Sequence, residues 1–271
     1  MAIQSTGVLR IGTADLEYRF IGPAPSEAPT IIMLHEGLGS AALWGDFPDR
    51  LQAATGTGVF AYSRAGYGAS TEVTLPRPLD YMSIEALEVL PVLLDRIGFR
   101  RGLLLGHSDG ASIAAIYAGG TGDHRVRGVV MIAPHFIVEE MGVAVIAQAR
   151  EAYERAGLKA KLARWHKHVD NAFYGWNDAW LDPKFREWDI SDYLAYIRVP
   201  VAIVQGADDQ YGTIRQIEIA REECYCPVDV TIVPGVGHSP HREASQVTLD
   251  IVSEFAKRIL NSHEGWAGRA A

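Results

Sequence analysis

The sequence predicts an α/β fold with a mostly parallel, doubly wound sheet, and three observations lead to this prediction. Segments rich in β-branched and aliphatic residues recur between Gly, Pro or charged residues, which is typical of buried strands. Amphipathic stretches such as Met82–Ile97 and Ala111–Gly119 separate them, as expected for parallel strands joined by crossover helices. Two earlier segments, Val8–Ile11 and Leu16–Ile21, predict an antiparallel pair at the sheet edge. The predicted buried strands are Thr30–His35, Gly58–Tyr62, Gly102–Gly106, Val126–Ile132, Val201–Gln205 and Val228–Val233.

The alternation stops between His135 and Arg198, where the sequence has helical periodicity and no convincing strand. We therefore expect an α/β core formed by residues 1–134 and 199–271, with a helical cap inserted at residues 135–198. The second half of this insertion is rich in aromatic rings. Such rings can form the core of a small subdomain or line an apolar pocket, and we expect both roles here without assigning them to individual rings. They include Trp165, Phe173, Tyr174, Trp176, Trp180, Phe185, Trp188, Tyr193 and Tyr196.

Composition excludes several classes of partner. Hydrophobic residues make up 48% of the chain and charged residues 21%, so a compact globular protein is expected. The net charge of −8 disfavours nucleic acid, which is bound through clustered Lys and Arg. No apolar run reaches the length of about 18 residues that spans a bilayer, and Met1 to Gly12 does not resemble a signal peptide. A cytoplasmic protein without a membrane partner is expected, and a homodimer is left open.

The two cysteines, Cys224 and Cys226, are predicted to be free thiols. In an extended segment, side chains one residue apart point to opposite faces, which disfavours a disulfide. A metal site at this C-x-C sequence would need further Cys or His ligands nearby. We expect no metal and no cofactor.

The strongest local signal is the G-x-S-x-G sequence Gly106-His107-Ser108-Asp109-Gly110. It follows a predicted strand and opens a predicted helix, which is the setting that such a nucleophile turn requires. The turn forces the serine into a strained backbone conformation, and the flanking glycines avoid collisions there. Ser108 is therefore the predicted nucleophile.

A serine hydroxyl needs an imidazole to accept its proton, and a carboxylate to orient that imidazole. His238 is the predicted base because it lies in a Gly-rich loop after the last strand, with His241 as a weaker alternative. Asp208 and Asp209 directly follow the strand Val201–Gln205, and we choose Asp209 over Asp208. The resulting order Ser108, Asp209, His238 differs from the chymotrypsin and subtilisin orders.

With these motifs placed, the chain from Val8 to about Leu260 resembles the α/β-hydrolase family. The sequence Leu34-His35-Glu36-Gly37-Leu38-Gly39-Ser40 is similar to the family's His-Gly loop. Ser63-Arg64-Ala65-Gly66-Tyr67-Gly68-Ala69-Ser70 looks like its Asp-x-x-Gly-x-Gly-x-Ser loop, with Ser63 in place of the acid. The resemblance implies oxyanion donors at the backbone amides of Gly37 and Asp109.

Two carboxylates depart from the family pattern. Glu36 stands where many members carry Gly, and Asp109 where many carry Met or Gln. Either they disfavour anionic substrates, or they turn away and accept hydrogen bonds from loop amides. The residues that we expect to contact the substrate are Glu36, His135, Trp176 and Trp180.

The predicted function is hydrolysis of a small, neutral and partly apolar ester through an acyl-enzyme at Ser108. A serine nucleophile excludes the family's haloalkane dehalogenases and epoxide hydrolases, which need an aspartate there. Two alternatives stay open. One is a carbon–carbon bond hydrolase of ring-cleavage products, and the other is a ligand-binding module of the same fold with little turnover.

Overall fold

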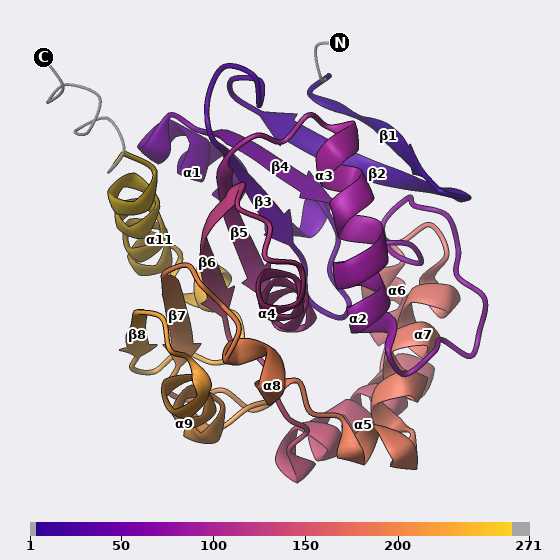
Figure 1. Cartoon of the computed structure of the whole chain (residues 1–271). Helices are drawn as coiled ribbons and strands as arrows, with labels where there is room; N and C mark the ends of the chain where they lie inside the picture. The colour runs from indigo at the N-terminus through magenta and orange to yellow at the C-terminus, as the bar shows by residue number, and fades with distance from the viewer. Residues whose placement is uncertain (1–3, 262–271) are drawn as a thin grey trace, which may run out of the picture.

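The computed structural model of the chain describes residues 4–261, and within them the strands form one eight-stranded sheet in the order β1-β2-β4-β3-β5-β6-β7-β8. β1 pairs antiparallel with β2 and β2 antiparallel with β4, while every other neighbouring pair is parallel. The predicted α/β fold and its antiparallel edge are confirmed (Figure 1). The strands are β1 Thr6–Ile11, β2 Ala14–Ile21, β3 Thr30–Leu34, β4 Gly58–Tyr62, β5 Gly102–His107, β6 Val126–Ile132, β7 Val201–Gly206 and β8 Val228–Val233.

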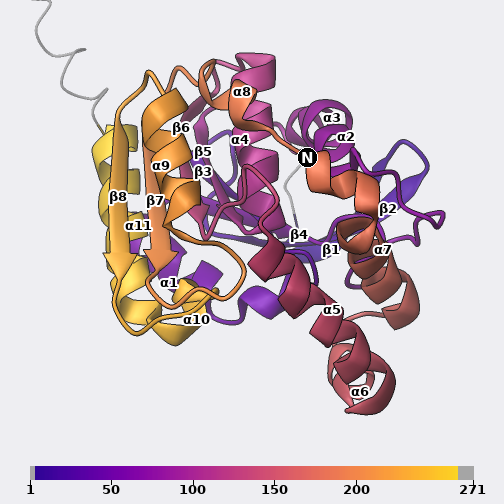
Figure 2. The same ribbon diagram turned by 90° about the horizontal axis from the view of Figure 1, so that it is seen from below.

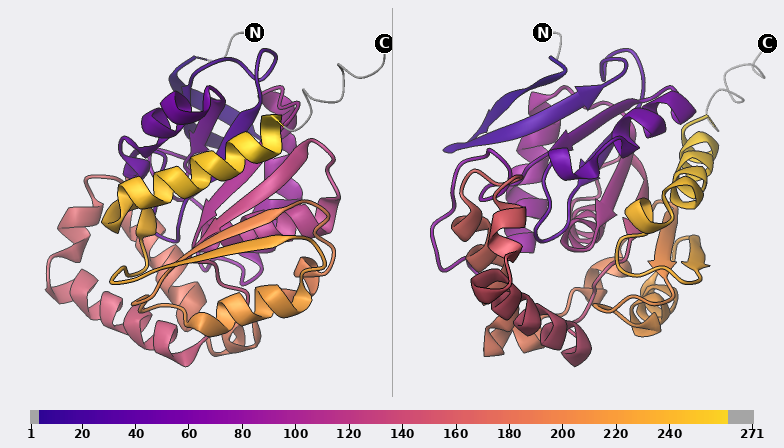
Figure 3. Two further views of the ribbon diagram at one scale, coloured as in Figure 1. Left: turned by 90° about the vertical axis from the view of Figure 1, so that its left-hand side faces the viewer. Right: turned by 180° about the vertical axis from the view of Figure 1, so that it is seen from behind.

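Helices cover both faces of the sheet because the inner strands are apolar on both faces. In β3, Ile31 and Met33 pack into one core cluster and Ile32 and Leu34 into the other. Helices α1 (Phe47–Thr55) and α11 (Ser245–Asn261) cover the first face, and α11 runs along the sheet in Figure 3. The second face carries α2 (Tyr81–Ile84), α3 (Leu90–Arg96), α4 (Asp109–Thr121) and α9 (Ile214–Glu223).

The amphipathic stretch Met82–Ile97 is helical, but it is not one regular α-helix. A π-helical turn, η2 (Glu85–Val89), lies between α2 and α3. Pro91 has no N–H to donate to a carbonyl one turn earlier, which agrees with the wider hydrogen-bond spacing of a π-helical turn at this point. Glu85 is buried on this turn and accepts a hydrogen bond of 2.6 Å from the Tyr62 hydroxyl.

All regular elements between β6 and β7 are helical in the described chain, and Figure 2 shows α5, α6 and α7 standing away from the sheet. Their rings pack against one another, since Tyr153 stacks on Phe173 at 3.7 Å and Phe185 on Trp188 at 5.4 Å. Trp165, in contrast, is 41% exposed. The helices are α5 Glu140–Arg155, α6 Leu158–Leu162, α7 Val169–Leu181, η3 Pro183–Glu187 and α8 Ser191–Leu194. The remaining short helices within residues 4–261 are η1 Ala42–Trp44 and α10 Pro240–Glu243.

The cysteines are free, as predicted, but the reasoning that separated their side chains was wrong. Cys224 is the C-cap of α9, so the segment is not a regular strand, and the two thiols share a hydrogen bond. That bond lowers the pKa of the Cys226 thiol to about 7 and raises the pKa of Cys224.

Between residues 4 and 261, none of the helices combines the length and apolar character that crossing a bilayer would demand.

The close approach of α4 to β3 gives a test of the fold. A Cβ atom on Gly110 would lie 2.0 Å from the Leu34 carbonyl oxygen, and backbone cannot move aside cheaply. We expect Gly110→Ala to lower the free energy of unfolding by about 1–3 kcal/mol or more. Gly175→Ala is the matched control, because its Cβ would meet only side-chain atoms, those of Arg77 and Leu75, each at 3.3 Å. Urea denaturation should show Gly175→Ala unchanged or more stable, and equal stability of both variants would contradict the packing argument.

Candidate active site

Ser108 lies on a sharp turn between β5 and α4. Its backbone has φ 53° and ψ −119°, a region that residues with a side chain rarely adopt. The flanking glycines make the turn possible, since a Cβ on Gly106 would lie 2.2 Å from the Gly110 carbonyl oxygen. The Ser108 amide donates to the Ile132 carbonyl at 2.9 Å, which ties the turn to β6. The sequence-predicted nucleophile thus has the strained geometry that the motif requires.

A cavity of about 250 Å³ lies over this turn, at the carboxyl ends of the parallel strands. Its lining includes eight of the nine predicted site residues. These are Glu36, Gly37, Ser108, Asp109, His135, Trp176, Trp180 and His238. The ninth, Asp209, is not part of the lining and contacts His238.

The His238 ring is held by Asp209. Its Nδ1 atom lies 2.9 and 2.8 Å from the two carboxylate oxygens, so Nδ1 carries the proton and Nε2 is left to accept one. Gln205 Nε2 and the Tyr211 amide each donate to the same carboxylate at 2.8 Å. Burial by itself would raise the pKa of Asp209, but the hydrogen bond and charge of His238 outweigh it and lower the pKa.

The alternative residues lie elsewhere. Asp208 is exposed, whereas Asp209 is buried. His241 is buried against Trp44, with ring centroids 4.8 Å apart, and burial holds its pKa well below the ordinary value. The geometry therefore favours Asp209 and His238 over Asp208 and His241.

His135 is a neutral imidazole in the cavity wall. Its ring lies 5.4 Å from Trp180 and 5.4 Å from His238. Burial, followed by the charge of His238, lowers the pKa of His135 to about 3. A neutral ring adjoining the cavity suits an uncharged substrate better than an anionic one.

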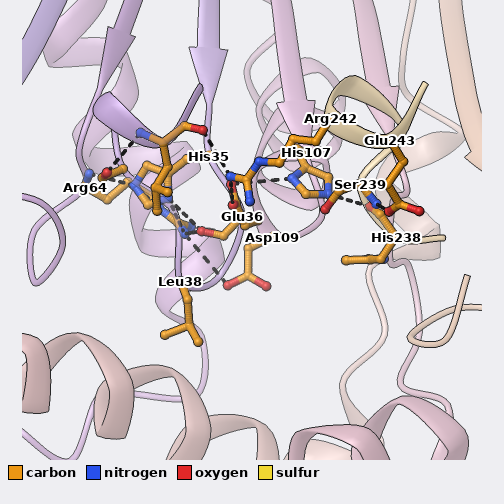
Figure 4. A network of polar contacts seen from close by, with 12 residues as sticks. His35, Glu36, Leu38, Arg64, His107, Asp109, His238, Ser239, Arg242 and Glu243 are labelled. Carbon is orange, nitrogen blue, oxygen red and sulfur yellow. Dashed lines mark hydrogen bonds and ion pairs between the residues drawn. The ribbon is translucent and has the colours of Figure 1, made fainter. Parts of the chain in front are cut away.

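The Glu36 carboxylate does not face a loop amide. It accepts a hydrogen bond of 2.8 Å from Arg242 of α10 and lies 3.4 Å from His107 Nδ1 (Figure 4). Burial by itself would raise the pKa of Glu36, but His107 and Arg242 outweigh it and hold the pKa well below its ordinary value. His107 also contacts the His238 carbonyl, at 2.8 Å through Nε2. His107, the residue before Ser108, thus connects the Glu36 loop with the loop that carries His238.

The Asp109 carboxylate binds side chains from other elements. Its Oδ2 accepts a hydrogen bond of 2.5 Å from the Tyr81 hydroxyl and lies 3.9 Å from Arg64 Nη2. Burial and the neighbouring Asp109 raise the pKa of Tyr81 well above 10, so Tyr81 stays protonated. Trp180 Nε1 in turn donates to the Tyr81 hydroxyl at 3.1 Å. Of the two alternatives for Glu36 and Asp109, the one in which they accept hydrogen bonds from loop amides is wrong for both side chains.

Tryptophan Trp176 covers the Gly37 loop. A Cβ on Gly37 would lie 2.2 Å from Trp176 Nε1, so only glycine fits under this ring. A side chain at position 37 would therefore displace either the loop or helix α7.

Sequence reasoning missed Arg64, Tyr81, His107 and Glu17. Glu17 of β2 accepts hydrogen bonds from Ser63 Oγ at 2.8 Å and from the Ala69 amide at 2.9 Å. It thereby supplies a carboxylate to the loop in which Ser63 replaces an acid. Arg64 and His107 stand inside the quoted motifs, so their position was a signal, whereas nothing in the sequence pointed to Tyr81 or Glu17.

No group of three or more His, Cys, Asp or Glu side chains suited to a metal ion is found among residues 4–261.

Residues 31–251 match the model of the alpha/beta hydrolase family. The chain belongs to the α/β-hydrolase family. Among curated proteins it is 26% identical to a non-heme haloperoxidase of Rhodococcus erythropolis, across 72% of this chain and 81% of that protein.

Solved structures of similar fold agree with this family membership. An enol-lactonase from Burkholderia xenovorans LB400 has a TM-score of 0.73 and 17% identity, covering 92% of this chain and 99% of that one. An esterase from Rhodococcus sp. ECU1013 has a TM-score of 0.68 and 17% identity, covering 94% and 100%. These likenesses show that the hydrolase fold extends over nearly the whole chain.

The lowered pKa of Asp209 gives a pH test of the His238–Asp209 contact. An unfolded Asp titrates near about 3.9, so a lower folded pKa stabilises the protein above about pH 4 and this contribution is lost as the pH falls through the folded pKa. The stability difference between the parent and Asp209→Asn should therefore shrink in urea titrations as the pH is lowered towards 2–3, roughly. Asp208→Asn is the matched control and should track the parent throughout. A difference for Asp209→Asn that is independent of pH would contradict the assignment.

Proposed function

We propose that the protein is a serine hydrolase that cleaves a small, neutral and partly apolar ester through an acyl-enzyme at Ser108. The observation that carries the proposal is the strained turn at Ser108, which lines the same cavity as a His238 ring oriented by Asp209. The enol-lactonase and esterase among the structural neighbours act on esters by their names, which agrees with this reaction class.

In the proposed reaction His238 Nε2 accepts the Ser108 proton while the serine oxygen bonds to the ester carbonyl carbon. The carbonyl oxygen becomes an oxyanion, held by the amides of Gly37 and Asp109. The Asp109 amide is the first N–H of α4, and the first N–H groups of a helix have no partner within the helix. His238 then protonates the leaving alcohol, and water repeats the steps to release the acid.

The walls of the cavity support a neutral, partly apolar substrate. Leu38, Ile146, Trp176 and Trp180 supply apolar surface. The acidic lining residues are Glu36, Asp109, Glu139 and Glu243, and no Lys or Arg among the described residues lines the cavity. A carboxylate substrate would find no cationic side chain there. This disfavours the carbon–carbon hydrolase alternative, whose ring-cleavage substrates are carboxylates.

The proposal includes a cap formed by residues 135–198, because α5 and α7 provide Ile146, Trp176 and Trp180 to the cavity. A ligand-binding module is the alternative from another class, and reaction with a fluorophosphonate distinguishes it from a hydrolase.

The central prediction concerns Ser108. We expect Ser108→Ala to fold normally and to lose ester turnover by about 10⁴–10⁶-fold, because the nucleophile is removed. Turnover of p-nitrophenyl acetate and fluorophosphonate labelling mapped by mass spectrometry provide the measurements. Ser112, one turn along α4, is fully buried and donates to the His135 carbonyl at 2.6 Å, so it should not be labelled. Labelling of Ser112, or retained turnover in Ser108→Ala, would refute the proposal.

A second prediction concerns the cap. Trp176→Ala and Trp180→Ala should change the relative rates of esters with different acyl groups more than the rate with an acetate ester, since both rings line the cavity. Trp165→Ala is the matched control, because that ring belongs to the same insertion, is 41% exposed and does not line the cavity. Equal slowing of every ester by both cavity variants would show that these rings are only structural.

A further inference from the structure

The orientation of the Gly37 amide is set by the carbonyl that precedes it. The Glu36 carbonyl and the Gly37 N–H belong to one planar trans peptide, so holding the oxygen fixes the direction of the N–H. Three donors hold this oxygen: His35 Nδ1 at 2.6 Å, Arg64 Nη2 at 2.9 Å and the Gly39 amide at 3.0 Å. Figure 4 shows Arg64 and His35 meeting at the Glu36 loop.

The backbone amide of residue 64 sets the tautomer of His35. The Arg64 amide donates to His35 Nε2 at 3.0 Å, so the proton of the neutral ring is on Nδ1 and points to the Glu36 carbonyl. Burial, followed by the charge of Arg64, holds the pKa of His35 well below its ordinary value. The ring therefore stays neutral, and its two nitrogens keep these roles.

A second contact of Arg64 reaches the other proposed oxyanion donor. Its Nη2 atom lies 3.9 Å from Asp109 Oδ2, and the Asp109 side chain belongs to the residue whose amide opens α4 (Figure 4). One guanidinium group thus contacts the two residues that bear the proposed donors.

The environment of the Arg64 side chain is unusual for a residue that serves only to fill space in the core. Its side chain is 1% exposed, and Nη1 has no hydrogen-bond partner among the described residues. Such burial of a cation with an unpaired N–H is unfavourable unless its charge is used. A cation bonded to the carbonyl end of a peptide polarises that peptide, and this strengthens the N–H at its other end as a donor.

We propose that Arg64 is a positioning residue of the oxyanion hole, which orients and polarises the Gly37 peptide and anchors Asp109. The inference rests on the serine hydrolase function proposed above. Arg64 is buried and does not line the cavity. Its side chain should therefore stabilise the transition state without contributing to substrate binding.

The test compares Arg64→Gln with Arg64→Lys on p-nitrophenyl acetate. We expect Arg64→Gln to lower kcat by about 10–10²-fold, less than the loss of a whole donor, while KM changes by less than about threefold. Arg64→Lys keeps the charge and should recover part of kcat. Arg77→Gln is the matched control, because Arg77 packs on the same Tyr67 ring at 5.0 Å, against 5.1 Å for Arg64, and donates to the Ala65 carbonyl rather than to the Glu36 loop.

A boronic acid provides a readout that a purely structural role would not reproduce. Boron bonds to the Ser108 oxygen, the serine proton passes to His238, and the resulting tetrahedral boronate anion resembles the oxyanion intermediate. In Arg64→Gln, the inhibition constant of an alkylboronic acid should rise by the same factor as kcat/KM falls. A folded Arg64→Gln variant with unchanged kcat and unchanged boronate affinity would overturn the proposal.

Folding and function need separate controls. Arg64→Gln leaves the Asp109 charge without a cationic partner, so Arg64→Gln/Asp109→Asn is tested beside it, with Tm measured for both. If the double variant has the Tm of the parent and kcat is still reduced, the result supports positioning of Gly37 by Arg64. Recovery of the parent kcat in the double variant would overturn it and leave Arg64 as a counter-ion of Asp109. The fluorophosphonate and Ser108→Ala results test the serine hydrolase function on the parent protein, so its failure is distinguishable from failure here.

Discussion

The close approach of α4 to β3 is the constraint on which the site depends. Gly110 lies so near the Leu34 carbonyl that no side chain fits between them, and Gly106 packs equally closely against the turn. Because the helix begins directly at the end of the strand, Ser108 adopts its strained conformation and lies beside the loop that follows β3. Ser108 and the Gly37 loop are therefore brought together by backbone packing, before any side-chain contact is made.

Buried polar contacts then connect this turn with the helices above it. Trp180 of α7 donates to Tyr81 of α2, Tyr81 donates to Asp109, and Asp109 lies next to Arg64. Each of these side chains is at most 4% exposed, so each bond is shielded from water and breaking one leaves a buried group unpaired. Since Trp180 also lines the cavity, a molecule that shifts this ring would disturb Asp109, the residue that follows Ser108.

Local patterns made the strands, the turn at Ser108 and the family resemblance predictable. β-branched runs and the G-x-S-x-G spacing depend on neighbours in the sequence, and the structure places strands and turn within a residue or two of their predicted bounds. Asp209 was harder to separate from Asp208, because adjacent residues share one sequence pattern and only the folded structure shows that Asp209 is buried and contacts His238. Tyr81 and Glu17 were unpredictable, since their partners Asp109 and Ala69 are distant in sequence and meet only in the folded chain.

The two unusual carboxylates illustrate how tertiary contacts change the meaning of a sequence. Glu36 and Asp109 suggested a negative field at the nucleophile, yet each has an arginine from another element: Arg242 at 2.8 Å and Arg64 at 3.9 Å. Opposite charges at such distances largely cancel each other's field at a third point. Among the described residues the cavity lining contains no Lys or Arg, so the proposed preference for neutral over anionic substrates rests on this absence of cations rather than on these two acids alone.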